Sequence, residues 1–189
     1  MSNGVILSLC DRSGEWPRPY AENGYDVISL DLGRGEDVRL LKVTDLPEIY
    51  GVLAAPPCTE FAVSGARWWS EKPPELLVEG LSVVDACLRI IYAVKPVFWA
   101  LENPVGRLKH YIGDYQFSFN PCDFGGYGDE EDAYTKKTLL WGVFNPPIPK
   151  PVDPVLGSKL HKLPPSKDRA ILRSLTPKGF SRAFYEANK

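Results

Sequence analysis

Residues 75–101 read ELLVEGLSVVDACLRIIYAVKPVFWAL, and this stretch decides the fold. Apolar side chains recur every three or four residues from Leu77 to Ile91, which is the spacing of one face of a helix. Lys95 and Pro96 end this helix, and the apolar run 97–101 follows at once. A helix that leads directly into a buried strand predicts one unit of an α/β protein.

Three earlier apolar runs resemble 97–101. They span residues 4–10, 26–32 and 50–55, and each is followed by polar or turn-forming residues. Nearly continuous apolar strands are expected where both faces of a sheet are covered. A short helix fits residues 17–23, with a proline in its first turn. The alternation of strands and helices predicts an α/β fold with a mostly parallel sheet.

The second half of the chain has a different pattern. Residues 115–120 and 134–141 are expected to be strands that add an antiparallel edge, with the acidic, glycine-rich segment 123–132 between them. The proline-rich stretch 145–165 is expected to be extended coil. A last helix fits residues 177–188, with Pro177 in its first turn.

Length and composition exclude several classes of protein. The chain has 189 residues, of which 44% are hydrophobic and 24% charged, so disorder and a coiled coil are poor interpretations. No apolar run approaches the roughly 20 residues of a membrane-spanning helix, and the first residues lack the basic region of a secretory signal. We therefore expect a single cytoplasmic domain over residues 1–189, in which the basic, proline-rich segment 142–165 and the last helix are included.

The four cysteines are far apart in the sequence, with no pair at metal-ligand spacing. This argues against a disulfide framework or a zinc site and favours a reducing compartment. Cys10, Cys87 and Cys122 are expected to have structural roles. We expect no bound metal.

Charge is distributed unevenly along the chain. Residues 1–133 contain 11 Lys or Arg and 21 Asp or Glu, a net charge of −10, whereas residues 134–189 contain 11 and 3, a net charge of +8. Such asymmetry is typical of a protein with an anionic partner near the basic end, although a solvated basic surface is an equally good interpretation.

Three polar clusters follow predicted parallel strands, where ligands bind in open α/β sheets. The first is the loop 10–15, with Asp31 ending the next strand about 20 residues later, where an acidic side chain often binds a ribose hydroxyl. The second is Pro56-Pro57-Cys58, and the third begins with Glu102. Each has a simpler interpretation: Asp31 and Glu102 as helix caps, and Cys58 as a small buried apolar residue.

Together and in this order, the clusters resemble the motifs of the cytosine-5 DNA methyltransferase family. Pro56-Pro57-Cys58 is similar to the family's nucleophile motif, and Glu102-Asn103-Pro104 is similar to its glutamate-asparagine motif, with proline in place of the usual valine. Residues 37–39 resemble the motif that reads adenine, residues 134–138 stand where the family has an arginine-bearing strand, and residues 173–177 loosely resemble a late motif. The compact form looks like that of bacteriophage members, which act in the host cytoplasm.

The resemblance implies a Rossmann-like fold that binds S-adenosylmethionine and methylates carbon 5 of cytosine in DNA. Cys58 would add to carbon 6 of a base that is flipped out or single-stranded, and Glu102 would bind ring nitrogen 3. The residues expected to bind the cofactor are Leu9, Cys10, Asp11, Gly14, Asp31, Leu32, Asp37, Val38 and Pro56. Those expected to bind the DNA are Pro57, Arg67, Asn103, Lys136, Lys137 and Thr138.

The sequence departs from the family in ways that keep other functions open. The loop 8–14 has one glycine where the family has a phenylalanine and two glycines, and the family's large target-recognition domain has no counterpart after Trp141. The alternatives are a catalytically inactive accessory protein that binds the cofactor or DNA, and an enzyme that methylates RNA or a free pyrimidine nucleotide. Arg67 lies in a segment expected to be flexible, where Trp68 and Trp69 would stack on a base or pack in the core.

Overall fold

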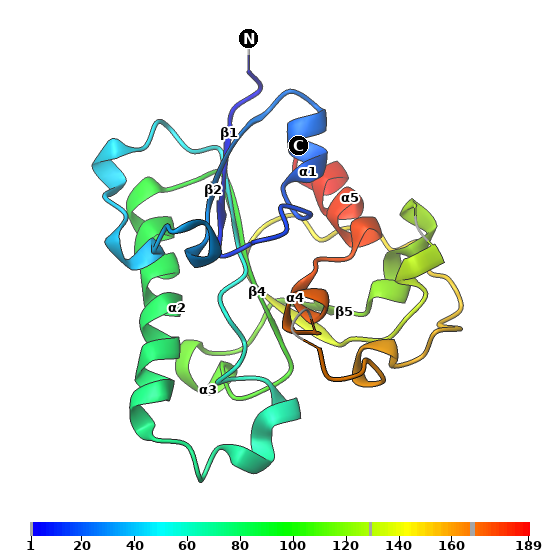
Figure 1. Cartoon of the computed structure of the whole chain (residues 1–189). Helices are drawn as coiled ribbons and strands as arrows, with labels where there is room; N and C mark the ends of the chain where they lie inside the picture. Colours follow the sequence, from blue (N-terminus) through cyan, green and yellow to red (C-terminus); the bar gives the residue numbers. More distant parts are fainter. Residues whose placement is uncertain (1, 129, 167–168) are drawn as a thin grey trace.

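The structure, a computed structural model, describes residues 2–128, 130–166 and 169–189. A six-stranded sheet in the order β2-β1-β3-β4-β6-β5 forms its centre (Figure 1). The four strands β2, β1, β3 and β4 run parallel, and β6 runs antiparallel to both β4 and β5. The predicted α/β fold with a mostly parallel sheet and an antiparallel addition is therefore confirmed. The strands are β1 (Val5–Leu9), β2 (Asp26–Leu30), β3 (Gly51–Ala54), β4 (Phe98–Pro104), β5 (Phe117–Phe119) and β6 (Thr138–Val143).

Helices cover both faces of the sheet. The helix α2 lies on one face, and α1 and α5 lie on the other (Figure 1). The helices are α1 (Arg18–Glu22), α2 (Pro74–Val94), α3 (Lys109–Ile112), α4 (Arg169–Ser174) and α5 (Lys178–Ala187). Within the part of the chain that the structure describes, no helix is long and apolar enough to cross a membrane.

Successive residues of β1 pack against different helices. Leu7 and Leu9 belong to the apolar cluster that includes Ile90 of α2, whereas Ile6 packs on the other face with Phe184 of α5. Side chains alternate between the two faces of a strand, so a strand covered on both faces must be apolar throughout. This explains the continuous apolar runs in the sequence.

Aromatic rings attach α5 to the sheet. Phe180 stacks on Phe119 of β5 with ring centroids 3.8 Å apart, and Phe184 meets Trp16 edge-on at 5.7 Å. Gly179 lets the first turn approach closely, because a Cβ atom there would lie 2.3 Å from the carbonyl oxygen of Phe124. The final helix is therefore an integral part of the core.

The structure corrects several predicted boundaries. Glu102, Asn103 and Pro104 lie inside β4, which extends beyond the apolar run, so the interpretation of Glu102 as a helix cap is wrong. The strand β6 begins at Thr138, four residues later than expected, because the preceding residues form no ladder with β4. The glycine-rich acidic segment contains the 3-10 helices Pro121–Tyr127 and Glu130–Asp132, and α3 and α4 are too short for their periodicity to stand out in the sequence.

The proline-rich stretch is mostly coil, as expected, apart from the 3-10 helix Lys159–His161. Backbone hydrogen bonds nevertheless attach it to the rest of the fold. Val152 donates to the carbonyl of Cys122 at 2.9 Å, and Leu156 donates to the carbonyl of Ala133 at 2.9 Å. The stretch is thus held in place before the chain reaches α4.

The chain that follows β3 returns to pair with the chain that follows β4. Ala62 and Gly106 form an isolated antiparallel bridge, and Val63 donates to the carbonyl of Val105 at 2.8 Å. A Cβ atom on Gly106 would lie 1.8 Å from the carbonyl oxygen of Phe61, so this contact requires glycine.

We expect Gly106→Ala to lower the free energy of unfolding by about 2 kcal/mol or more, because the new methyl group must displace backbone. Gly65→Ala, in the same region, is the matched control: its nearest contact would be an ordinary 3.9 Å, so its effect should stay within about 0.5 kcal/mol. Urea unfolding of both variants measures the difference. Equal stabilities would show that the close approach does not constrain the fold.

Candidate functional site

A buried hydrogen bond joins the loop after β3 to β4. Asn103 is fully buried, and its Nδ2 donates to the carbonyl oxygen of Pro56 at 2.9 Å. Pro56 is buried, Pro57 is exposed and Cys58 is half-buried. The carboxyl ends of β3 and β4 are adjacent because the strands are parallel, with Ala54 opposite Leu101. The structure therefore brings the two motifs predicted from the sequence together.

Lys136 reaches the same edge because β6 runs antiparallel. Pro104 at the end of β4 lies opposite Thr138 at the start of β6, so the residues just before β6 lie beside the carboxyl end of β4. The Nζ of Lys136 donates to the carbonyl oxygen of Arg173 at 2.9 Å. The direction of β6 thus places a cation at the edge that carries Cys58 and Glu102.

Arg173 is a member of this site that the sequence analysis did not propose as a site residue. Its Nη2 lies 3.4 Å from Oγ of Ser64, in the 3-10 helix Val63–Trp68 that follows Cys58. Its positive charge also acts on the Cys58 thiol. The loose motif at residues 173–177 and the positive charge of the C-terminal part were its only sequence signals, and neither indicated where it lies.

The charges around Cys58 act on its pKa in opposite directions. Burial raises the pKa of the thiol above its ordinary value, and the negative charge of Glu102 raises it further. The positive charges of Lys136 and Arg173 oppose this rise. Cys58 is therefore a protonated thiol near neutral pH, with two cations close enough to stabilise its thiolate.

The surroundings of Glu102 raise the pKa of its carboxyl above the ordinary value. Burial raises the pKa of the carboxyl, the negative charge of Asp11 raises it further, and Lys136 lowers it. Burial, followed by the charges of Asp132 and Glu102, also raises the pKa of Tyr134. A carboxyl that holds its proton can donate a hydrogen bond as well as accept one.

The segment after Cys58 is firmly attached, whereas the sequence suggested a flexible one. Glu60 forms an ion pair with Lys72 at 2.8 Å, and Nε of Arg107 donates to the carbonyl of Glu60 at 2.7 Å. The guanidinium of Arg107 also covers the half-buried ring of Trp69. Trp69 therefore packs within the protein.

Trp68 and Arg67 remain at the surface of this segment. The Trp68 side chain is 48% exposed, and the guanidinium of Arg67 lies over its ring, 4.9 Å from the centroid. A stacked cation and indole form a flat surface that is suited to a base or a phosphate.

The carboxylate of Asp11 organises the loop after β1. It accepts hydrogen bonds from the backbone of Ser13 and Gly14 at 3.0 and 3.1 Å, and from the backbone of Trp16 at 3.2 Å. Gly14 has a φ of 68°, which glycine adopts without strain. Asp11 is 4% exposed. Its side chain therefore shapes the loop from inside.

Asp31 and Leu32 form a small surface beside this loop. Oδ1 of Asp31 accepts from the backbone N–H of Gly33 at 2.7 Å, and among the described residues Oδ2 has no hydrogen-bond partner. Leu32 is 69% exposed. An exposed apolar side chain beside a carboxylate with an open oxygen suits a ligand that has both a hydroxyl group and an aromatic ring.

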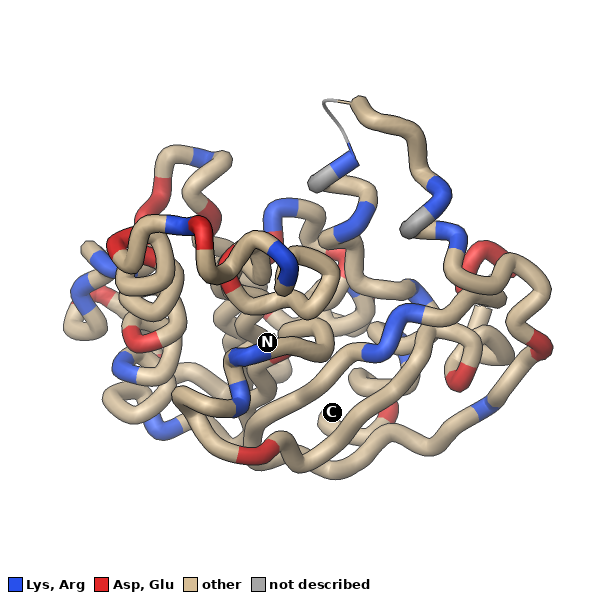
Figure 2. The backbone as a smooth tube through the Cα atoms, turned by 90° about the horizontal axis from the view of Figure 1, so that it is seen from below, with Lys and Arg blue, Asp and Glu red and all other residues tan. Residues whose placement is uncertain are grey.

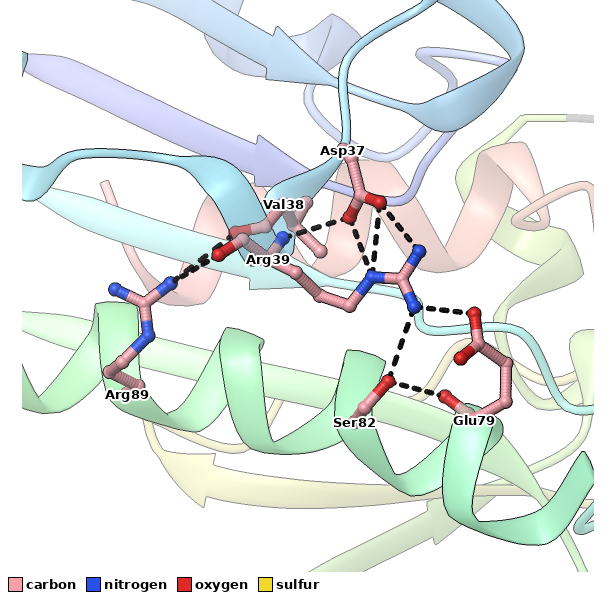
Figure 3. Close-up of polar contacts among 6 residues, drawn as sticks. All are labelled: Asp37, Val38, Arg39, Glu79, Ser82 and Arg89. Atoms are coloured by element: carbon pink, nitrogen blue, oxygen red, sulfur yellow. Dashed lines mark hydrogen bonds and ion pairs between the residues drawn. The ribbon is translucent and has the colours of Figure 1, made fainter. Parts of the chain in front are cut away.

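Asp37 is held within the protein. Arg39 donates to both of its carboxylate oxygens and continues to Glu79 and Ser82 on α2 (Figure 3). The hydrogen bonds from Arg39 hold the pKa of Asp37 below its ordinary value. Arg89 donates to the backbone of the same turn, and Val38 is 3% exposed. Asp37 and Val38 thus fix the turn against α2.

The remaining predicted DNA-binding residues differ in exposure. Lys137 is exposed, whereas Thr138 is 3% exposed and its hydroxyl donates to the carbonyl of Lys136. Figure 2 shows further Lys and Arg residues on the segments of chain just before and just after residues 167–168. The basic residues without a carboxylate partner among the described residues include Lys136, Lys137, Lys159, Lys162, Arg169 and Arg173.

A cavity of about 620 Å³ lies elsewhere, between α1, α5 and the proline-rich stretch. Its lining includes Glu22, Tyr127, Lys150 and Arg182 and none of the sequence-predicted site residues. The cavity is lined by both acidic and basic side chains, and no cysteine is among them. Among the described residues, no group of three or more His, Cys, Asp or Glu side chains could hold a metal ion. The carboxyl edge of the sheet is therefore the candidate site.

Comparisons with known proteins relate part of the chain to a methyltransferase. No family model matches the sequence. Over 95 residues, 49% of this chain, it is 33% identical to type II methyltransferase M.Bsp6I of Bacillus sp. (strain RFL6), and the chain covers 28% of that protein. A crystal structure described as a DNA modification methyltransferase encoded within an E. coli prophage aligns over 88% of this chain and 50% of that one, with 16% identity and a TM-score of 0.43. The sequence similarity to methyltransferases is thus distant, and the chain spans under a third of the curated relative.

The opposing charges predict how Cys58 should react with iodoacetamide. Glu102→Gln removes a negative charge, so the pKa of Cys58 should fall and its alkylation at pH 7.5 should become several-fold faster. Lys136→Ala removes a positive charge and should slow alkylation. Peptide mass spectrometry measures the rate at Cys58 alone.

Lys137→Ala is the matched control, because this neighbouring lysine is not among the charges that act on the thiol. Its rate should equal that of the unmodified protein. If Glu102→Gln and Lys136→Ala change the rate in the same direction, the electrostatic description of the site is wrong.

Proposed function

We propose that this protein transfers a methyl group from S-adenosylmethionine to carbon 5 of cytosine in DNA, as a single domain with a Rossmann-like fold. The observation that carries the proposal is the pairing of a thiol, Cys58, with a half-buried carboxyl, Glu102, at the carboxyl edge of a mostly parallel sheet. The similarity to a type II methyltransferase supports the same chemistry.

The surface formed by the loop after β1 and the turn after β2 fits the cofactor. The open oxygen of Asp31 is suited to a ribose hydroxyl, and exposed Leu32 to the face of adenine. We propose that Cys10 and Gly14 contact the cofactor and that Leu9, Asp11, Asp37, Val38 and Pro56 shape the site from within the protein. When bound there, S-adenosylmethionine supplies an activated methyl group.

Cys58 and Glu102 act on different atoms of the base. The Cys58 thiol loses its proton, and its sulfur forms a bond to carbon 6 while the positive charges of Lys136 and Arg173 stabilise the thiolate. In its protonated form, which burial favours, the carboxyl of Glu102 donates to ring nitrogen 3 and stabilises the electron density that the addition places on the ring. Carbon 5 thereby becomes nucleophilic. After methylation, loss of the carbon-5 proton expels the thiolate.

The DNA contacts surround the thiol. A stacked cytosine cannot reach Cys58, so the base must leave the helix or start single-stranded. Exposed Pro57, Arg67 and Trp68 belong to the chain around and after Cys58, whereas Lys136 and Lys137 belong to the chain just before β6. Asn103 and Thr138 are buried, so we propose that they act by positioning Pro56 and Lys136.

We expect Cys58→Ser to abolish transfer of a tritiated methyl group to DNA, because a serine hydroxyl is a far weaker nucleophile. Glu102→Gln should reduce the rate by about a hundredfold or more, the scale of one lost transition-state contact. Calorimetry should show that both variants still bind S-adenosylmethionine, whereas Asp31→Ala should weaken that binding. An active Cys58→Ser protein would refute the mechanism.

DNA that contains 5-fluorocytosine tests the covalent step, since fluorine cannot leave carbon 5 as a proton does. We expect an adduct at Cys58. Turnover on RNA or on a free nucleotide but not on DNA would select the alternative enzyme. Cofactor or DNA binding without adduct or turnover would select the accessory protein.

Binding to DNA should weaken steeply as salt increases, because the basic residues around the site release counterions from phosphates. Lys162→Gln should reduce the slope of log affinity against log salt by about 1, the effect of one lost phosphate contact. Lys95→Gln, at the opposite end of β4, is the matched control and should leave the slope unchanged. Fluorescence anisotropy measures both slopes, and equal slopes would contradict the placement of the DNA.

A further inference from the structure

Two thiols meet where β1 ends beneath α2. Cys10 directly follows β1, is half-buried and packs against the apolar cluster that includes Cys87, a fully buried residue of α2. The interaction of the Cys87 thiol with the Cys10 side chain, followed by burial, raises the pKa of Cys87. Both cysteines are free thiols.

The backbone fixes the position of Cys10. Its φ of 62° is unusual for a residue other than glycine, and its N–H donates to the carbonyl of Leu30 at 2.7 Å. The carboxylate of Asp11 holds the next residues. Because the chain is restrained on both sides of Cys10, its packing against the cluster that contains Cys87 follows from the fold.

We propose that Cys10 and Cys87 form an oxidisable dithiol, which hydrogen peroxide converts into a disulfide. The sulfur of half-buried Cys10 attacks one peroxide oxygen and breaks the O–O bond, which gives a sulfenic acid and releases one molecule of water. The Cys87 sulfur then attacks the Cys10 sulfur, loses its proton and displaces a second molecule of water. The peroxide is reduced, and the two thiols are oxidised to one disulfide.

The other cysteines do not share this arrangement. The Cys122 sulfur lies 3.9 Å from a carboxylate oxygen of Asp123, which disfavours its thiolate, and Cys122 is buried. Cys58 stands beyond β3, among charged side chains. A bond between Cys10 and Cys87 would attach the loop after β1 to α2, so oxidation would act on the surface proposed to bind the cofactor.

The test treats the full-length protein with hydrogen peroxide and digests it without reduction. We expect a linked peptide pair that joins Cys10 to Cys87, two hydrogen masses lighter than the separate peptides, and the loss of two titratable thiols of the four. Dithiothreitol should restore both thiols. Circular dichroism should show the native fold before and after oxidation.

Two variants sharpen the experiment. In Cys87→Ala, Cys10 has no partner thiol, so it should continue to the sulfinic acid, which dithiothreitol does not reverse. Cys122→Ala is the control and should form the same linked pair as the unmodified protein. The proposal is overturned if Cys10 in the unmodified protein reaches the sulfinic acid without a linked pair, if another pair of cysteines links, or if the link forms only after denaturation. None of these outcomes depends on methyl transfer.

Discussion

The hydrogen bond from Asn103 to the carbonyl of Pro56 is the constraint on which the candidate site depends. Pro56 and Pro57 have no N–H groups, so the loop cannot complete its own backbone hydrogen bonds. The buried carbonyl of Pro56 needs a donor, and Asn103 provides it from the neighbouring strand. The position of Cys58 relative to Glu102 is therefore set by the sheet itself. Oδ1 of Asn103 has no hydrogen-bond partner among the described residues.

The second constraint is the direction of β6. A parallel strand beside β4 would place its first residues at the far edge, whereas antiparallel β6 starts next to the end of β4. Lys136 therefore donates a hydrogen bond to the carbonyl of Arg173, and the positive charges of both residues act on the Cys58 thiol. The C-terminal third of the chain contributes cations to a site whose thiol and carboxyl come from the first two thirds.

The sheet could be predicted from the sequence because burial on both faces leaves a strong local signal. The runs around Leu7, Leu53 and Ala100 are apolar throughout, and α2 has an extended helical period. The proximity of Cys58 and Glu102 was also predictable, since the carboxyl ends of parallel strands lie at one edge. Their chemical roles remain predictions.

Other features of the site could not be predicted, because they depend on contacts between residues far apart in the chain. Arg173 reaches Ser64 across more than a hundred residues, and Arg107 holds Glu60 and Trp69. The segment after Cys58 therefore appeared flexible in the sequence. Likewise, nothing in the pattern around Asp37 indicated that Arg39 would bind its carboxylate.

The exposed loop around Pro164 and Pro165 has a consequence for how such a protein could acquire new specificity. It lies at the surface between Lys159 and α4, and α4 returns the chain to the thiol through Arg173. Exposed loops accept inserted modules without loss of the surrounding fold. A module grafted into this loop would start and end near the basic residues Lys159, Lys162 and Arg169, while the sheet and its carboxyl edge stayed intact. The compact fold thus provides a ready point of attachment for modular evolution or engineering.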